Sequence, residues 1–194
     1  NAMGTVAPGA DISVCHGKNN LTKIPPAYLT AMKKYTTTND TYWVNVCTED
    51  KNGDGTPDFM VIESTNLPEH KSVYFQTGQA LFETFDFNTN IYKFAPAYTA
   101  QAAHAAGSNK IAEQSITMRI PMAPGEAATK TKTALSTIGL ALNGVSFFNE
   151  SAGAGHEITE ELFTFDQCSG HPQQSGVYHY HVDPICLIRD LRGS

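Results

Sequence analysis

The chain has 194 residues, of which 41% are hydrophobic and 16% charged, so it is long enough to bury a substantial core. Its formal net charge of −6 provides no basic surface for nucleic acid or an anionic membrane. Every apolar run is shorter than the roughly 18–20 residues that span a bilayer, so we expect no transmembrane segment. We exclude residues 1–3, which resemble a tag remnant, and expect residues 4–194 to form a single domain.

Taken in chain order, the sequence predicts many short strands and little helix. A short helix is expected over 27–35, where apolar residues recur at helical spacing after two prolines. Aromatic and β-branched residues mark the expected strands, at 42–46, 59–62, 73–75, 91–94, 116–120, 138–142, 145–148 and 161–165. The remaining segments include an alanine-rich turn or loop at 97–106 and a long connection at 121–133. This pattern predicts a mainly β fold, a sandwich or an irregular barrel with one or two short helices.

An acidic, glycine-containing loop follows the first expected strand. Its oxygen-bearing side chains fall at alternate positions, as a hard cation such as calcium requires. They are Asp50, Asn52, Asp54, Thr56 and Asp58. Val61 stands where a complete EF-hand loop has its bidentate glutamate, so the segment is closer to shorter Asp-rich calcium turns. A plain hairpin accounts for the same residues, because Asn-Gly and Asp-Gly are strong turn signals. Both interpretations remain open.

The chain has an even number of cysteines, Cys15, Cys47, Cys168 and Cys186. None lies at a compact zinc-ligand spacing. We expect the local pairs Cys15–Cys47 and Cys168–Cys186, which close the shortest loops. Disulfides and a low charge content together predict a secreted, periplasmic or cell-surface protein. The alternative is four buried thiols in a cytosolic protein.

The run Tyr178-His179-Tyr180-His181 is the strongest functional signal. Side chains alternate between the faces of an extended segment, so the two histidines are expected to share one face and the two tyrosines the other. Alternate residues lie about 6.5–7 Å apart, close enough for two imidazoles to bind a single ion. Neutral imidazole suits transition metals such as zinc and copper.

Two further histidines are candidate ligands. A Cys168–Cys186 disulfide would bring His171 near the strand that carries the first pair, and would make the region rigid. We therefore predict His171 as a third ligand and His70 as a fourth.

The C-terminal region resembles the YHYH family, which is named for the tetrapeptide at 178–181. The matching pieces are at 120–124, 139–149, 168–172 and 176–181, with a looser match at 67–70. The resemblance covers roughly residues 60–190 and implies a predominantly bacterial, exported domain without an established activity. Many members of the family have aspartate where this chain has Asn143. An activity that needs that carboxylate would be lost here.

Three functions remain open from the sequence. The first is an exported domain that binds a transition metal or a small molecule through its histidines. The second is a metal-dependent hydrolase that uses the same histidines, since a His-bound ion with an open coordination position can activate water. The third is a surface or matrix interaction domain in which the tetrapeptide only stabilises the backbone. No catalytic residue and no protein partner is predicted.

Overall fold

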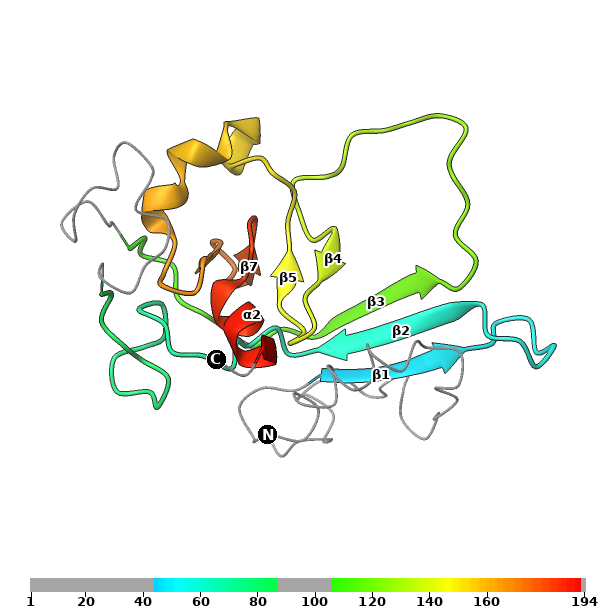
Figure 1. Ribbon diagram of the computed structural model, residues 1–194, viewed down its shortest axis with the longest axis horizontal. Coiled ribbons are helices and arrows are strands. Elements are labelled where there is room, and N and C mark those ends of the chain that lie inside the picture. The colour runs from blue at the N-terminus through cyan, green and yellow to red at the C-terminus, as the bar shows by residue number, and fades with distance from the viewer. Residues whose placement is uncertain (1–43, 87–105, 193–194) are drawn as a thin grey trace.

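The computed structural model describes residues 44–86 and 106–192, and Figure 1 shows their arrangement. This part of the chain is mainly β, as predicted, and forms two sheets but no closed barrel. The first sheet has the order β1-β2-β3, with β1 Val44–Glu49, β2 Phe59–Ser64 and β3 Ile116–Pro121. The second has the order β4-β5-β7-β6, with β4 Gly139–Leu140, β5 Ser146–Phe147, β6 Gly170–Pro172 and β7 Tyr178–Tyr180.

Among the described residues, helical structure is short and lies toward the C-terminus. Three 3-10 helices precede β6, namely η2 Gly153–Gly155, η3 Ile158–Glu160 and η4 Leu162–Thr164. One α-helix follows β7, α2 Ile185–Arg192. No helix in the described ranges is long and apolar enough to cross a membrane.

The first sheet is antiparallel and is built from the β-branched strands that the sequence predicts. Val44 and Ser64 lie opposite each other at one end of the β1–β2 pair, and Glu49 and Phe59 at the other. The side of the sheet that contains Val44 and Ile62 packs against Leu187 of α2, and all three side chains are buried. Burial of apolar side chains is the main stabilising contribution here.

A tight turn between β4 and β5 joins the second sheet to the first. The hydroxyl of Ser64, at the end of β2, donates to the carbonyl of Gly144 over 2.7 Å. Gly144 has a positive φ of 81°, and a Cβ atom there would lie 2.4 Å from side-chain atoms of both Ser64 and Val44. Only glycine fits this close approach. The turn also explains why the predicted strands at 138–142 and 145–148 form only two residues each.

The second sheet places the tetrapeptide strand at its centre. β7 lies beside β5 (Figure 1), with which it pairs in parallel. It pairs antiparallel with β6, where His171 lies opposite His179. Tyr178 and Tyr180 are fully buried in a core with Tyr74 and Val145. The predicted disulfide Cys168–Cys186 is present and connects the residues before β6 to α2.

Two predicted strands are absent. Residues 73–75 form a turn, in which the hydroxyl of Ser72 accepts the backbone N–H of Tyr74 and so replaces a strand pairing. Residues 161–165 form η4 instead of a strand, because Leu162 and Phe165 are three residues apart and are buried in the same core cluster. That spacing suits a 3-10 helix.

Other predictions fall partly or wholly outside the described residues. The helix at 27–35, the strand at 91–94, most of the segment at 97–106 and Cys15 are among them. The strands at 59–62 and 116–120 are confirmed, and the first expected strand is described from Val44 onward. The helix α2 was not predicted.

Candidate metal centre

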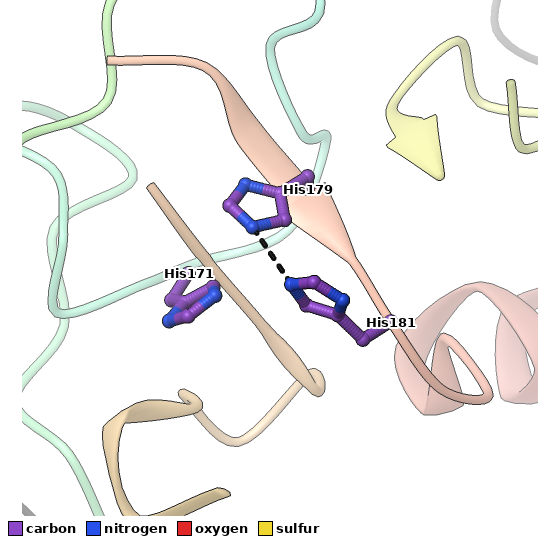
Figure 2. A group of neighbouring side chains, drawn as sticks. All are labelled: His171, His179 and His181. Atoms are coloured by element: carbon purple, nitrogen blue, oxygen red, sulfur yellow. Dashed lines mark hydrogen bonds between the residues drawn. The ribbon is translucent and has the colours of Figure 1, made fainter. Parts of the chain in front are cut away.

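Three histidines meet beside the second sheet and form what we call the histidine cluster. His171 lies in β6, His179 in β7, and His181 one residue beyond β7. One ring nitrogen from each lies within 4.8 Å of the other two, and Figure 2 shows the rings gathered from the two strands. The strand alternation predicted from the sequence therefore holds, with the histidines on one face of β7 and the tyrosines on the other. In the described ranges this is the one such group of His, Cys, Asp or Glu side chains.

Backbone carbonyls fix the tautomers of the two tetrapeptide histidines. Nδ1 of His179 lies 3.0 Å from the carbonyl oxygen of Val177, and Nδ1 of His181 lies 2.5 Å from that of Asn149. A carbonyl oxygen only accepts, so each Nδ1 carries the proton and donates it. The two Nε2 atoms, which the dashed line in Figure 2 joins over 3.0 Å, therefore both present lone pairs when the rings are neutral.

The third imidazole is held in the same tautomer by a threonine. The hydroxyl of Thr164 donates to the carbonyl of Glu161 over 2.7 Å, so its oxygen accepts from Nδ1–H of His171, also over 2.7 Å. Nε2 of His171 is thereby left with a lone pair. This atom is buried and has no hydrogen-bond partner among the described residues. Buried polar atoms without partners are rare and usually indicate a role beyond packing.

Burial keeps the three rings neutral. Desolvation, together with the neighbouring His179 and His181, lowers the pKa of His171 to about 2. Desolvation also lowers the pKa of His179 to about 4 and lowers that of His181, although their hydrogen bonds to carbonyls act in the opposite direction. Neutral imidazole is the form that binds metals. Near neutral pH no proton is therefore expected between the facing nitrogens.

Two phenylalanines limit the rotation of the rings. Phe148 stacks on His179 with a centroid distance of 3.9 Å and an interplanar angle of 20°. Phe165 lies parallel to His181 at 6.0 Å and meets His171 edge-on at 4.9 Å. These contacts orient the ligand atoms before any ion binds, which lowers the ordering cost of binding.

The histidine cluster faces an open cleft of about 430 Å³. Its other lining residues include Asn149, Glu161 and the half-exposed Leu135. A molecule in this cleft can therefore approach the cluster directly. The cleft combines apolar walls with a few convergent polar groups, as small-molecule sites generally do.

The tyrosines of the tetrapeptide take part in a different network. The hydroxyl of Tyr178 lies 2.8 Å and 3.0 Å from the two carboxylate oxygens of Asp166, to which it donates. Asp166 is fully buried and also accepts from the hydroxyl of Ser72 and the backbone N–H groups of Cys168 and Gly170. Burial, with the nearby Asp166 carboxylate adding to it, raises the pKa of Tyr178 well above its ordinary value. This part of the motif stabilises the fold.

The structure does not bring His70, the predicted fourth ligand, together with the other three histidines. It lies on the tyrosine side of β7, where Nε2 is 3.2 Å from the hydroxyl of Tyr180 and the ring meets Tyr178 edge-on. Asn143 lies on the same side, and its amide donates to Glu69 over 2.7 Å and contacts Tyr180 at 3.3 Å. Asn143 is thus a buried hydrogen-bond donor to a carboxylate.

The predicted calcium ligands lie in the exposed loop between β1 and β2, and backbone N–H groups of the loop occupy several of their oxygens. The two carboxylate oxygens of Asp50 accept from Gly53 and Gly55, at 2.6 Å and 2.7 Å. The remaining contacts are Asp54 accepting from Thr56 at 2.7 Å, Asn52 accepting from Asp54 at 2.9 Å and Asp58 accepting from Lys51 at 2.8 Å. These bonds account for the loop as a hairpin, and calcium binding stays a prediction.

Sequence reasoning missed Glu161 and Thr164. Both lie where a strand was predicted, and in a strand their side chains would lie on opposite faces. The apolar pair Leu162 and Phe165, spaced by three, is the signal that could have indicated a helical turn and brought the two residues together.

Comparison with known protein families supports the resemblance seen in the sequence. Searches of curated proteins and of solved structures found no match for the chain. The profile of the family described as YHYH protein matches residues 117–194, a region that includes the whole histidine cluster. Residues 117–194 of this chain are therefore similar to the YHYH family, as the sequence resemblance predicts.

Proposed function

We propose that the chain is a metal-binding domain in which His171, His179 and His181 hold one transition-metal ion, zinc or copper, through their Nε2 atoms. The supporting observation is the convergence of three unprotonated nitrogens within 4.8 Å. Each ring already donates its only N–H to an oxygen, so no ring can donate to another. Metal-binding histidines generally donate their second N–H to such a partner.

A cation resolves the electrostatic conflict in this arrangement. Two lone pairs that face each other over 3.0 Å repel, and burial disfavours the proton that could separate them. A zinc ion holds nitrogen ligands at about 2.0–2.1 Å, which places tetrahedral ligands about 3.4 Å apart. The Nε2 atoms of His179 and His181 lie 3.0 Å apart, and the ligand nitrogens of all three histidines lie within 4.8 Å of one another. Small ring rotations are therefore sufficient to reach the spacing that zinc requires.

The structural interpretation of the tetrapeptide applies to its tyrosines. The hydroxyl of Tyr178 donates to the carboxylate of Asp166. Nε2 of His171, in contrast, is buried and has no hydrogen-bond partner in the described part of the chain. A role limited to folding would favour partners for both residue types. The histidines are therefore assigned to binding.

The Cys168–Cys186 disulfide supports an oxidising location for this domain. We propose that the protein is exported and works in the periplasm, at the cell surface or outside the cell. Metal-dependent hydrolysis is the second candidate function. It is favoured by the cleft of about 430 Å³ beside the nitrogens, which leaves room for water and a substrate on the bound ion.

Elemental mass spectrometry tests the proposal on protein without a polyhistidine tag, after loading with zinc or copper and removal of excess metal. We expect about one ion per chain in the wild type and none in the His179→Ala/His181→Ala variant. His156→Ala is the matched control, because His156 is exposed and pairs with Glu160 outside the cluster. Circular dichroism checks that each variant is folded. Absence of uptake by folded wild type, or equal uptake by the double variant, would contradict the proposal.

A further inference from the structure

We propose that Glu161 is a fourth ligand of the same centre, so that the ion is held by three imidazoles and one carboxylate. This inference rests on the proposed metal binding and adds one negatively charged ligand to the three neutral imidazoles. Oε2 of Glu161 lies 3.7 Å from Nε2 of His171. Two ligands of one tetrahedral zinc ion lie about 3.4 Å apart, so a small side-chain movement brings Oε2 into position.

The position of Glu161 in the chain holds its carboxylate near the cluster. Glu161 joins η3 to η4, and its Oε1 accepts the backbone N–H of Gly153 over 2.9 Å. Its own carbonyl accepts the hydroxyl of Thr164, which in turn accepts from His171. One short segment therefore positions both the carboxylate and the third imidazole. Hydrogen-bonded partners of this kind are typical of metal-binding carboxylates.

Charge balance favours a carboxylate in this place. Three neutral imidazoles leave the full double charge of a divalent ion in a mostly buried site, which is unfavourable without a counter-charge. Among the described residues that line the cleft, Glu161 alone carries a formal charge. The adjacent Glu160 does not serve, because it pairs with His156 at 3.1 Å and both side chains are 59% exposed.

The added oxygen ligand narrows the class of metal. Imidazole together with carboxylate suits divalent ions such as zinc or Cu(II), whereas Cu(I) is selected by thiolate and thioether ligands. The site is therefore assigned to a divalent ion. Four protein ligands leave a tetrahedral ion without an open coordination position, so ligation by Glu161 favours metal binding over the hydrolase alternative.

Zinc affinity of matched variants tests this inference. Competition titrations with a zinc indicator are made on the wild type, Glu161→Gln and Glu160→Gln. Glutamine keeps an oxygen for the Gly153 N–H and removes only the negative charge, so the fold is expected to remain intact. We expect Glu161→Gln to bind zinc about 10–100-fold more weakly, with Glu160→Gln unchanged. The visible spectrum of bound Co(II) is expected to change only in Glu161→Gln. Equal zinc affinity and an unchanged Co(II) spectrum would overturn the inference.

A second measurement on the wild type does not depend on the variant. The infrared difference spectrum after one equivalent of zinc is expected to show a shifted carboxylate stretch, and no carboxylate change would overturn the assignment of Glu161. Metal binding by the histidines and ligation by Glu161 can be tested separately. If the wild type binds neither zinc nor Co(II), the proposed function fails as well. If the histidine variants lose zinc but Glu161→Gln binds it as tightly as the wild type does, only the fourth ligand is wrong.

Discussion

On the tyrosine face of β7, the hydroxyl of Tyr178 donates to a buried carboxylate that also accepts from Ser72 and two backbone N–H groups. On the histidine face, every Nδ1–H has an oxygen acceptor, but the Nε2 atoms of His179 and His181 face each other over 3.0 Å and Nε2 of His171 is buried without a hydrogen-bond partner among the described residues. The tyrosines are fully buried, whereas His171 and His181 are only partly buried and line the cleft with His179. The contrast shows that hydrogen-bond satisfaction and access to the cleft together separate a structural cluster from a candidate binding site.

The largest expected effect comes from removing the acceptor on the tyrosine face. Asp166→Ala leaves the Tyr178 hydroxyl, the Ser72 hydroxyl and two N–H groups without their acceptor, at about 1–3 kcal/mol for each buried group left unpaired. We expect the free energy of unfolding to fall by about 3–5 kcal/mol in urea titrations. A loss below about 1 kcal/mol would show that this network does not support the fold.

The histidine face is expected to contribute additional stability when metal is bound. At a free zinc concentration of 100 times the dissociation constant, binding adds about 2.7 kcal/mol to the free energy of unfolding of the wild type. The His179→Ala/His181→Ala variant should gain nothing, and Tyr178→Phe should retain the gain. Thermal melting with zinc and after chelation measures this. A zinc effect that survives the double substitution would place the metal elsewhere.

Acid is expected to destabilise the metal-free protein through the histidine face. The pKa of His179 falls from 6.5 to about 4 on folding, so between these values the unfolded chain binds more protons than the folded one. Stability from this group is present above pH 6.5 and is lost as the pH falls through 4, by about 3 kcal/mol. Urea titrations at several pH values check this. His179→Ala/His181→Ala should show a shallower decline, and an identical decline would contradict the account.

Removing one hydroxyl from the tyrosine face is a milder change. Tyr178→Phe keeps the ring that fills the space beside Gly170, where a Cβ atom would lie 2.4 Å from the tyrosine Cζ. It leaves Asp166 with three of its donors, so we expect a loss of about 1–2 kcal/mol and unchanged zinc stoichiometry. Loss of zinc binding in a folded Tyr178→Phe protein would mean that the two faces are coupled.

The smallest effect is expected at the loop of residues 50–58. Its carboxylates already accept backbone N–H groups, so any calcium site there would be weak. Thermal melting with millimolar calcium, compared with chelated protein and with Asp54→Asn, tests this prediction. A melting temperature that does not move would leave only the hairpin.

Local patterns in the sequence predict much of this region. The alternation at 178–181 predicts the two faces of β7, and the cysteine spacing predicts the disulfide that holds β6 near α2. The β-branched runs predict β2 and β3. Each of these depends on neighbours in the chain, so the information lies within a few residues.

The remaining features depend on contacts between distant residues. The carbonyl of Asn149 that orients His181 is a backbone atom, which no residue pattern identifies. His70 lies 110 residues before Tyr180 in the sequence, and only the folded chain shows that it reaches Tyr180 and not the cluster. Glu161 resembles a solvated acid in the sequence, and its place beside His171 follows from the 3-10 turns around it.

The most direct test of the central claim is anomalous X-ray diffraction at the zinc edge from crystals of the zinc-loaded protein. We predict one strong peak about 2.0–2.1 Å from Nε2 of His171, His179 and His181. A zinc peak confined to the loop of residues 50–58, or no peak near the three histidines in a well-ordered crystal, would contradict the account.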